Sequence, residues 1–233
     1  MNAHSPLIRA WTGIVRFGFR LLYNEFAFTY DTVSKVVSFG AWRCWGRAGL
    51  KHLNAAAGDA VLEIAHGTGD IHVDLHAAGY RVIGIDLSPN MGKIASRKLR
   101  KQGIIPALAR GKAQALPFAS ESFAAVISTF PAEFIVAPET LREVNRVLRP
   151  GGRFVIVPNA MFTSKDAGTS ALDFLYRITG QRTGPSDEAR ARHSFDLASL
   201  FAPYGFDTHA LEEVCPRSLV TVIIAEKRAN KQN

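Results

Sequence analysis

Residues 61–70 read VLEIAHGTGD, which places an acid, Glu63, inside an apolar run that ends in a glycine-rich turn. Ala65, Gly67 and Gly69 are small residues at alternate positions, so the backbone of this turn can approach a ligand closely. A helix that begins after such a turn presents free N–H groups and a positive dipole end to a carboxylate or phosphate. The stretch therefore predicts a binding site for a ligand that carries one of these groups.

Two common cofactor motifs do not fit the spacing of this turn. A dinucleotide site needs G-x-G-x-x-G, but the third glycine position falls on His72 or on Asp70, depending on where the motif begins. A Walker phosphate loop needs Gly-Lys-Ser/Thr, which is absent here. A nucleotide-dependent oxidoreductase is therefore disfavoured.

Apolar runs alternate with helical patterns from Ala60 onward, and this alternation predicts parallel βαβ units in a doubly wound α/β sheet. Continuous apolar runs such as VLEIA and FVIV indicate a sheet that is covered on both faces. Ser88 is placed to cap the helix that follows it. The expected strands are 60–65, 80–86, 106–110, 123–128, 153–157 and 218–225, and the expected helices end near 78, span 88–102 and span 139–148.

Composition limits the remaining function classes. The net charge is +8, but the basic residues are spread along the chain and no nucleic-acid motif is present, so we expect no nucleic-acid partner. No apolar run approaches the roughly 20 residues that span a bilayer, and no secretory signal is recognisable. Cys44 and Cys215 lie far apart and form no metal or redox spacing. We therefore expect ordinary thiols in a reducing compartment and a cytoplasmic location.

His72 and His76 stand four residues apart, a spacing that can bind zinc on one helix face. No third ligand is obvious. We therefore expect the solvent-facing side of the first sheet-covering helix rather than a metal site.

Further motifs follow the turn in a regular order. GIDLSPNM ends the second strand with Asp86, GKAQALPF spans 111–118, FAAVISTF spans 123–130, and LRPGG at 148–152 precedes RFVIV. Together with Glu63 and its turn, these motifs resemble those of class I S-adenosylmethionine (SAM)-dependent methyltransferases. Ala65 stands where that family more commonly has its first glycine.

The resemblance implies a Rossmann-like, doubly wound, mostly parallel seven-stranded sheet with an N-terminal helical cap, and SAM as cofactor. In the family, the acid at Glu63 binds around the amino group of the methionine moiety, and a carboxylate beside an ammonium is a strong, charge-assisted contact. The acid at Asp86 binds the ribose hydroxyls, and Leu87 and Met91 lie near the adenine. The implied cofactor-binding residues are Glu63, Ala65, His66, Gly67, Gly69, Asp86, Leu87, Met91, Ala113, Gln114 and Ser128.

Two positions depart from the family pattern. Lys112 replaces the acid that commonly accepts a hydrogen bond from the adenine amine, and Ala124 replaces the usual Asp of strand four. The adenine would then be held by backbone around Ala113 and Gln114. An alternative to the enzyme is a catalytically degenerate SAM-binding or partner-binding protein with this fold.

The N-terminal part is similar to the ubiquinone/menaquinone C-methyltransferase group and its small-molecule relatives, on the pattern Tyr30-Asp31 followed by VSKVVSFGAWRCW. In such enzymes a helical cap closes over SAM and shapes the acceptor pocket. Tyr30 and Trp45 are candidates for its wall, although both also fit packing within the cap, and for Trp45 packing is favoured. The loop after strand four differs from that group, and its Glu133 either orients or deprotonates an acceptor or faces solvent. Catalytic candidates are Glu133, His66 and Tyr30.

Residues 7–28 mix apolar and aromatic residues with Arg9, Arg16 and Arg20, which fits either packing on the main domain or contact with an anionic membrane surface. Both interpretations fit a small, lipophilic acceptor of the quinone, isoprenoid or lipid type. Peripheral membrane contact through the N-terminal helices stays open, and the sequence does not define the oligomeric state. The expected boundaries are 1–55 for the cap, 56–233 for the SAM-binding domain, and about 160–203 for an acceptor-side insertion.

Overall fold

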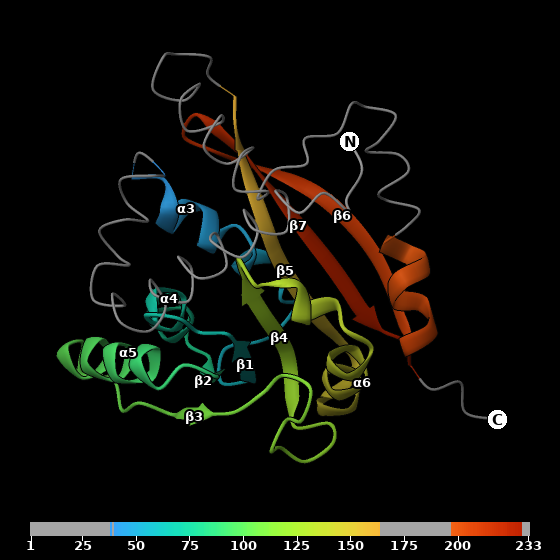
Figure 1. Ribbon diagram of the computed structural model, residues 1–233, viewed down its shortest axis with the longest axis horizontal. Helices are drawn as coiled ribbons and strands as arrows, with labels where there is room; N and C mark the ends of the chain where they lie inside the picture. Colours follow the sequence, from blue (N-terminus) through green and yellow to red (C-terminus); the bar gives the residue numbers. More distant parts are fainter. Residues whose placement is uncertain (1–37, 39, 164–196, 230–233) are drawn as a thin grey trace, which may run out of the picture.

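The structure, a computed structural model, describes residues 38, 40–163 and 197–229. It contains one sheet of seven strands with helices on both faces (Figure 1). The strands are β1 Ala60–Ile64, β2 Arg81–Asp86, β3 Leu108–Arg110, β4 Phe123–Thr129, β5 Leu148–Phe162, β6 Phe206–Cys215 and β7 Ser218–Lys227. The helices and 3-10 turns are α3 Trp42–Arg47, η2 Leu50–His52, α4 Asp70–Ala77, α5 Pro89–Lys101, η3 Glu133–Val136, α6 Pro138–Val147 and η4 Ala202–Tyr204.

The strand order is β3-β2-β1-β4-β5-β7-β6. Neighbouring strands from β3 to β5 run parallel, whereas β7 runs antiparallel to both β5 and β6. The predicted Rossmann-like, mostly parallel seven-stranded sheet is therefore confirmed. Among the described residues, no helix is both long and apolar enough to cross a membrane.

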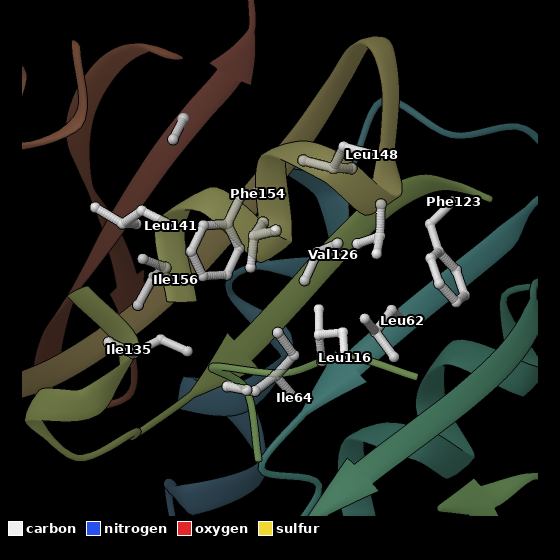
Figure 2. Close-up of a cluster of buried hydrophobic side chains, with 14 of the residues drawn as sticks. Leu62, Ile64, Leu116, Phe123, Val126, Ile135, Leu141, Leu148, Phe154 and Ile156 are labelled. Carbon is white, nitrogen blue, oxygen red and sulfur yellow. The ribbon is translucent and has the colours of Figure 1, made fainter. Parts of the chain in front are cut away.

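Two apolar clusters, one on each face, hold the sheet. Leu62 and Ile64 of β1 and Val126 of β4 pack in the cluster that α6 covers, which Figure 2 draws. Val61 of β1 and Ala125 of β4, which point the other way, pack in the cluster that includes α3 and α4. Adjacent strand residues face opposite sides of a sheet, so an unbroken apolar run is buried on both faces, as the sequence predicts.

Several element boundaries differ from the sequence-based expectation. Strand β6 was not predicted, because FDTHALEEVC lies at the edge of the sheet and buries only its first and last residues. Strand β5 is longer than expected, running from Leu148 through the 150–152 turn to Phe162. The expected insertion at 160–203 thus begins inside β5, residues 164–196 lie outside the described part, and residues 197–201 are helical.

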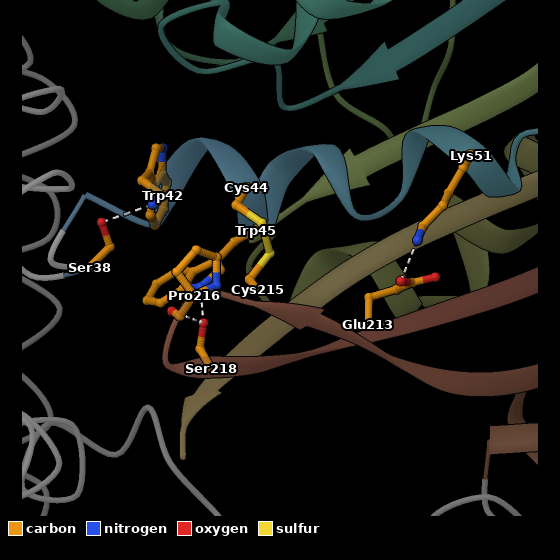
Figure 3. Close-up of a disulfide and its surroundings, with 9 residues drawn as sticks. All are labelled: Ser38, Trp42, Cys44, Trp45, Lys51, Glu213, Cys215, Pro216 and Ser218. Atoms are coloured by element: carbon orange, nitrogen blue, oxygen red, sulfur yellow. Dashed lines mark hydrogen bonds and ion pairs between the residues drawn. A yellow bond between two sulfur atoms is a disulfide. The ribbon is translucent and has the colours of Figure 1, made fainter. Parts of the chain in front are cut away.

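The two cysteines form a disulfide, so the expectation of ordinary thiols is wrong (Figure 3). Cys44 of α3 and Cys215 at the end of β6 have Cα atoms 6.0 Å apart, although they are 171 positions apart in sequence. Spacing along the chain could not reveal this pairing, because only the sheet order brings the last strands beside α3. The cytoplasmic location stays a prediction, and it loses the support that free thiols would have given.

Candidate functional site

The turn after β1 has an unusual backbone. Ala65, Gly67 and Gly69 have φ angles of +57°, +53° and +84°. A left-handed conformation costs an L-residue roughly 1–2 kcal/mol, whereas glycine adopts it freely. Ala65 therefore carries strain at the position where the family more commonly has glycine, and Gly69 begins α4 as its N-cap.

Asp86, at the carboxyl end of β2, joins this turn to the next helix. Its Oδ2 accepts from the Gly67 N–H at 3.0 Å, and its Oδ1 accepts from the Ser88 N–H at 2.8 Å. The predicted cap is present, because the Ser88 hydroxyl oxygen accepts from the Met91 N–H at 3.3 Å. Each oxygen of Asp86 keeps further acceptor capacity. The carboxylate is thus held in place by backbone and can still accept from two hydroxyl groups.

A cavity of about 350 Å³ opens beside Asp86, at the carboxyl ends of β1 and β2. Ligands of open α/β sheets bind at this edge, near the point where the strand order reverses, here between β1 and β4. Leu87, 57% exposed, offers an apolar face to it. The cavity combines a carboxylate that can accept hydrogen bonds with walls of apolar side chains and backbone, and this combination fits an adenosine group. The lining residues are Ile64, Ala65, Ile85, Asp86, Leu87, Gly111, Lys112, Ala113, Gln114 and Phe134.

Glu63 is buried beneath the turn and pairs with His72, whose Nδ1 lies 2.9 Å from Glu63 Oε2. His72 is fully buried, so the expectation that His72 and His76 form a solvent face is wrong for His72. The sequence does not indicate this pair, because spacing along the chain does not show that His72 lies on the side of α4 that faces Glu63 of β1. Burial raises the pKa of Glu63 to about 8 and lowers the pKa of His72 to about 4.

A second acid on α4, Asp74, anchors α3. Arg43 and Arg47 both donate bidentate hydrogen bonds to its carboxylate, at 2.6–3.2 Å. Burial alone would raise the pKa of Asp74, but the hydrogen bonds from Arg47 and Arg43 outweigh it and lower the pKa. The described part of the cap is therefore fixed to the first helix of the cofactor half.

Three predicted cofactor residues have structural contacts instead of a place in this cavity. Met91 is buried, and the Ser128 hydroxyl is buried and donates to the Ile64 carbonyl at 2.8 Å. Gly69 allows α4 and α5 to approach, because a Cβ there would lie 3.0 Å from the Cβ of Ala95. Ser128 thus acts on the site indirectly, by holding the end of β1.

His66 is buried, with its Nδ1 2.9 Å from the Gly67 carbonyl oxygen. It lines a different cavity of about 530 Å³, between α5 and β3, rather than the cavity beside Leu87. That cavity shares Asp86 with the first and carries the cations Lys93, Arg97, Arg100 and Arg110. The walls of the smaller cavity come from the strand ends at the switch point, the edge at which ligands of open α/β sheets bind.

The side that follows β4 carries an aromatic cluster. Phe130 has a φ of +49°, donates its N–H to the Val157 carbonyl at 2.7 Å, and stacks on Trp42 with ring centroids 4.5 Å apart. Trp45 is buried and donates to the Ser218 hydroxyl at 2.7 Å, which places it in the core (Figure 3). Trp42 and Phe130 were not among the predicted site residues, and the signal for Phe130 was an aromatic residue directly after the end of β4.

Of the three catalytic candidates, Tyr30 lies outside the described residues. Glu133 is exposed at the start of η3, next to Phe134 of the cavity wall. Among the residues that the structure describes, no cluster of three or more potential metal ligands occurs.

Sequence comparison identifies relatives along most of the chain. Residues 19–176 match the model of the ubiE/COQ5 methyltransferase family. The chain is 32% identical to the ubiquinone/menaquinone biosynthesis C-methyltransferase UbiE of Syntrophotalea carbinolica, over 80% of each protein. It is 35% identical to the demethylmenaquinone methyltransferase of Thermus thermophilus, over 70% of this chain and 74% of the relative.

Solved structures share the fold at lower identity. The YcgJ protein of Bacillus subtilis aligns with a TM-score of 0.56 at 17% identity, over 78% of this chain and 98% of that one. A phosphoethanolamine N-methyltransferase of Haemonchus contortus in complex with SAM aligns with a TM-score of 0.56 at 17% identity, over 81% of this chain and 53% of that one.

Proposed function

Because the chain belongs to the ubiE/COQ5 methyltransferase family, we propose that this SAM-dependent methyltransferase methylates a ring carbon of a small, quinone-like acceptor. The observation that carries the proposal is the cavity beside Asp86, in a chain whose curated relatives are named for quinone methylation. The alternative of a catalytically degenerate protein is not favoured.

We assign the cofactor's parts to described residues. Asp86 accepts from the ribose hydroxyls while the Gly67 and Ser88 N–H groups hold its carboxylate. Leu87 packs against the adenine, and the backbone at Ala113 lines the same cavity. Lys112 lines the same cavity, so the adenine amine has a cation where the family more often has an acid. Glu63, below the turn, meets the ammonium group of the methionine moiety.

When bound, SAM supplies an electrophilic methyl group on its sulfonium. The chain's task is then to place a nucleophile in line with that methyl group and to exclude competing water. A ring carbon is a good nucleophile only in the reduced, hydroquinone form, most of all after a phenolic proton has left. We therefore expect the hydroquinone, rather than the oxidised quinone, to be the substrate.

Trp42 and Phe130 form the acceptor platform in this proposal. Both are half-buried, they stack on each other, and Phe130 directly follows β4, which pairs with β1 in the sheet. Aromatic rings stabilise one another by offset stacking by about 0.5–1.5 kcal/mol beyond their buried area. Their flat faces thus suit an aromatic ring with an apolar tail.

Glu133 is the candidate base in this proposal. It is an exposed carboxylate at the start of η3, two residues before the buried Ile135 and beside Phe134 of the cavity wall. Transfer to carbon releases one ring proton to solvent or base after the new C–C bond forms. A carboxylate near the phenol can take the phenolic proton that activates this carbon.

The test is methyl transfer from SAM to demethylmenaquinone with a shortened tail, either pre-reduced or left oxidised, followed by mass spectrometry. We expect a mass gain of one CH₂ only for the reduced acceptor. Glu133→Gln should lower kcat and leave the dissociation constant of SAM unchanged, and Trp42→Ala should raise the KM for the acceptor. Binding of SAM without any transfer to reduced acceptors would refute the acceptor assignment.

A further inference from the structure

The Glu63–His72 pair is more than a buried contact, because its proton lies next to the cofactor turn. Glu63 comes from β1 and His72 from α4, and their side chains are 3% and 0% exposed. Gly84 of β2 makes room for the pair, since a Cβ there would lie 3.1 Å from His72 Nδ1 and 3.0 Å from His66 Cδ2. Three elements thus enclose one carboxyl and one imidazole.

At neutral pH the pair holds one proton on the Glu63 carboxyl and one on the neutral His72 ring. Burial raises the pKa of Glu63 and lowers the pKa of His72, so the carboxyl keeps its proton and the imidazole stays neutral. In that state the Glu63 O–H donates to His72 Nδ1. No net charge is then buried, which avoids the large cost of an ion in a low-dielectric interior.

Of the acids near the turn, Glu63 is the one that we expect an arriving cation to deprotonate. After burial, His66 lowers its pKa, whereas Asp86, Asp70 and Asp74 raise it. These three acids already have donors. Asp74 is bound by Arg43 and Arg47, Asp70 by Lys98, and Asp86 by the N–H groups of Gly67 and Ser88.

We propose that His72 is a positioning residue that holds the Glu63 carboxyl and its proton, and that the arriving ammonium group of SAM expels one proton from this pair to solvent. The inference rests on the proposed function, because it takes Glu63 as the partner of that ammonium. The Glu63 O–H proton passes to Nδ1 of His72, and the proton on Nε2 of His72 goes to buffer, so one O–H and one N–H bond break and one N–H bond forms. His72 does not retain both protons, because an imidazolium would then be buried beside the ammonium.

His72 can pair with Glu63 both before and after the ammonium group binds, because no hydrogen bond at its Nε2 fixes the tautomer of the ring. Within the described part of the chain, the buried Nε2 of His72 has no hydrogen-bond partner. Before binding, Nδ1 accepts from the carboxyl. After binding, Nδ1 carries the hydrogen that came from the carboxyl and donates it to the carboxylate, while Nε2 has lost its hydrogen, so the ring changes tautomer and stays neutral.

The first test is isothermal titration calorimetry of S-adenosylhomocysteine, which carries the same ammonium, at pH 6.5 in buffers of different ionisation enthalpy. We expect about one proton released per site, and a dissociation constant that rises about tenfold per pH unit as the pH is lowered below the Glu63 titration. Methylthioadenosine, which lacks the amino-acid part, should bind without releasing a proton. ¹⁵N NMR of the His72 ring should show the change of tautomer.

Substitutions distinguish the role of Glu63 from the role of His72. Glu63→Gln should abolish proton release, whereas Glu213→Gln, a change in an acid that Lys51 and His52 bind, should leave it unchanged. His72→Leu removes the partner of the charged carboxylate, so the affinity for S-adenosylhomocysteine should reach its maximum at a higher pH. His72→Gln should restore the wild-type dependence of affinity on pH, because its amide can donate or accept.

Each outcome separates this inference from the cofactor assignment. Binding of S-adenosylhomocysteine without proton release, or a His72→Leu profile identical to wild type, would overturn the inference and leave the cofactor site intact. No binding of S-adenosylhomocysteine or of methylthioadenosine would instead refute the proposed cofactor site, and with it the premise for Glu63.

Discussion

Replacing Glu63 by Gln should make the free protein more resistant to alkaline pH. Folding raises the pKa of Glu63 from 4.5 to about 8, so between these values the folded state binds more protons than the unfolded state. Stability then falls as the pH rises through this range. His72 acts oppositely, because its pKa falls from 6.5 to about 4 and its contribution rises with pH until about 6.5.

The two contributions nearly cancel below pH 6.5, and the Glu63 contribution dominates above it. From pH 6.5 to beyond pH 8 the Glu63 contribution covers about 1.5 pH units, or about 2 kcal/mol at 1.36 kcal/mol per unit. We therefore expect the wild-type free energy of unfolding to fall by about 1–2 kcal/mol from pH 6.5 to 9. The Glu63→Gln protein, whose amide has no proton to lose, should show no such fall.

Urea unfolding at half-unit pH steps measures this difference, with the midpoint and slope fitted at each pH. Glu213→Gln is the matched control, because hydrogen bonds from Lys51 and His52 lower the pKa of Glu213 and keep it ionised throughout this range. That control should keep the wild-type decline. A wild-type stability that is flat above pH 6.5, or an equal decline in Glu63→Gln, would show that Glu63 is not held protonated in the folded chain.

Three further predictions concern the same half of the molecule. Asp86→Ala should weaken SAM binding by about 1.5–3 kcal/mol, the range for hydrogen bonds to a charged group, and an unchanged dissociation constant would remove Asp86 from the site. Ala65→Gly should not lower the free energy of unfolding, because relief of roughly 1–2 kcal/mol of left-handed strain exceeds the added chain entropy of about 0.4–1 kcal/mol; a clear loss in a urea titration would contradict this. Cys44→Ser with Cys215→Ser should lower stability by about 3–5 kcal/mol for a closed loop of 171 residues, and oxidised and doubly substituted proteins that unfold at the same urea concentration would argue against the bond.

The cofactor half of the fold was predictable because its signals are local. The apolar run before the turn, the Ser88 cap and the acid at Asp86 all lie within a few residues of the element that they define. Each was found where the sequence placed it, with Asp86 accepting from the Gly67 N–H and Ser88 capping α5. These local signals indicated the edge of the sheet where the cavity opens, although Met91 and Ser128 do not line it.

Contacts between distant elements were not predictable. The Cys44–Cys215 bond depends on where the last two strands add to the sheet, and the polar sequence of β6 does not indicate a strand. The partner of Glu63 depends on the rotation of α4, which a helix with polar residues on several sides does not specify. His72 was therefore assigned to solvent although it is fully buried.

The turn after β1 carries two separate costs in one short segment. Ala65 adopts a left-handed backbone, and Glu63, two residues earlier, is buried with a raised pKa. Either cost could be removed by a single substitution without change to the surrounding core, since glycine fits the first position and glutamine the second. Natural sequences keep such local conflicts mainly where function needs them. A ligand that places an ammonium beside Glu63 would stabilise the ionised carboxylate, and this form is reached more easily at pH 8 than at pH 6. The cofactor should therefore stabilise this chain more at pH 8 than at pH 6.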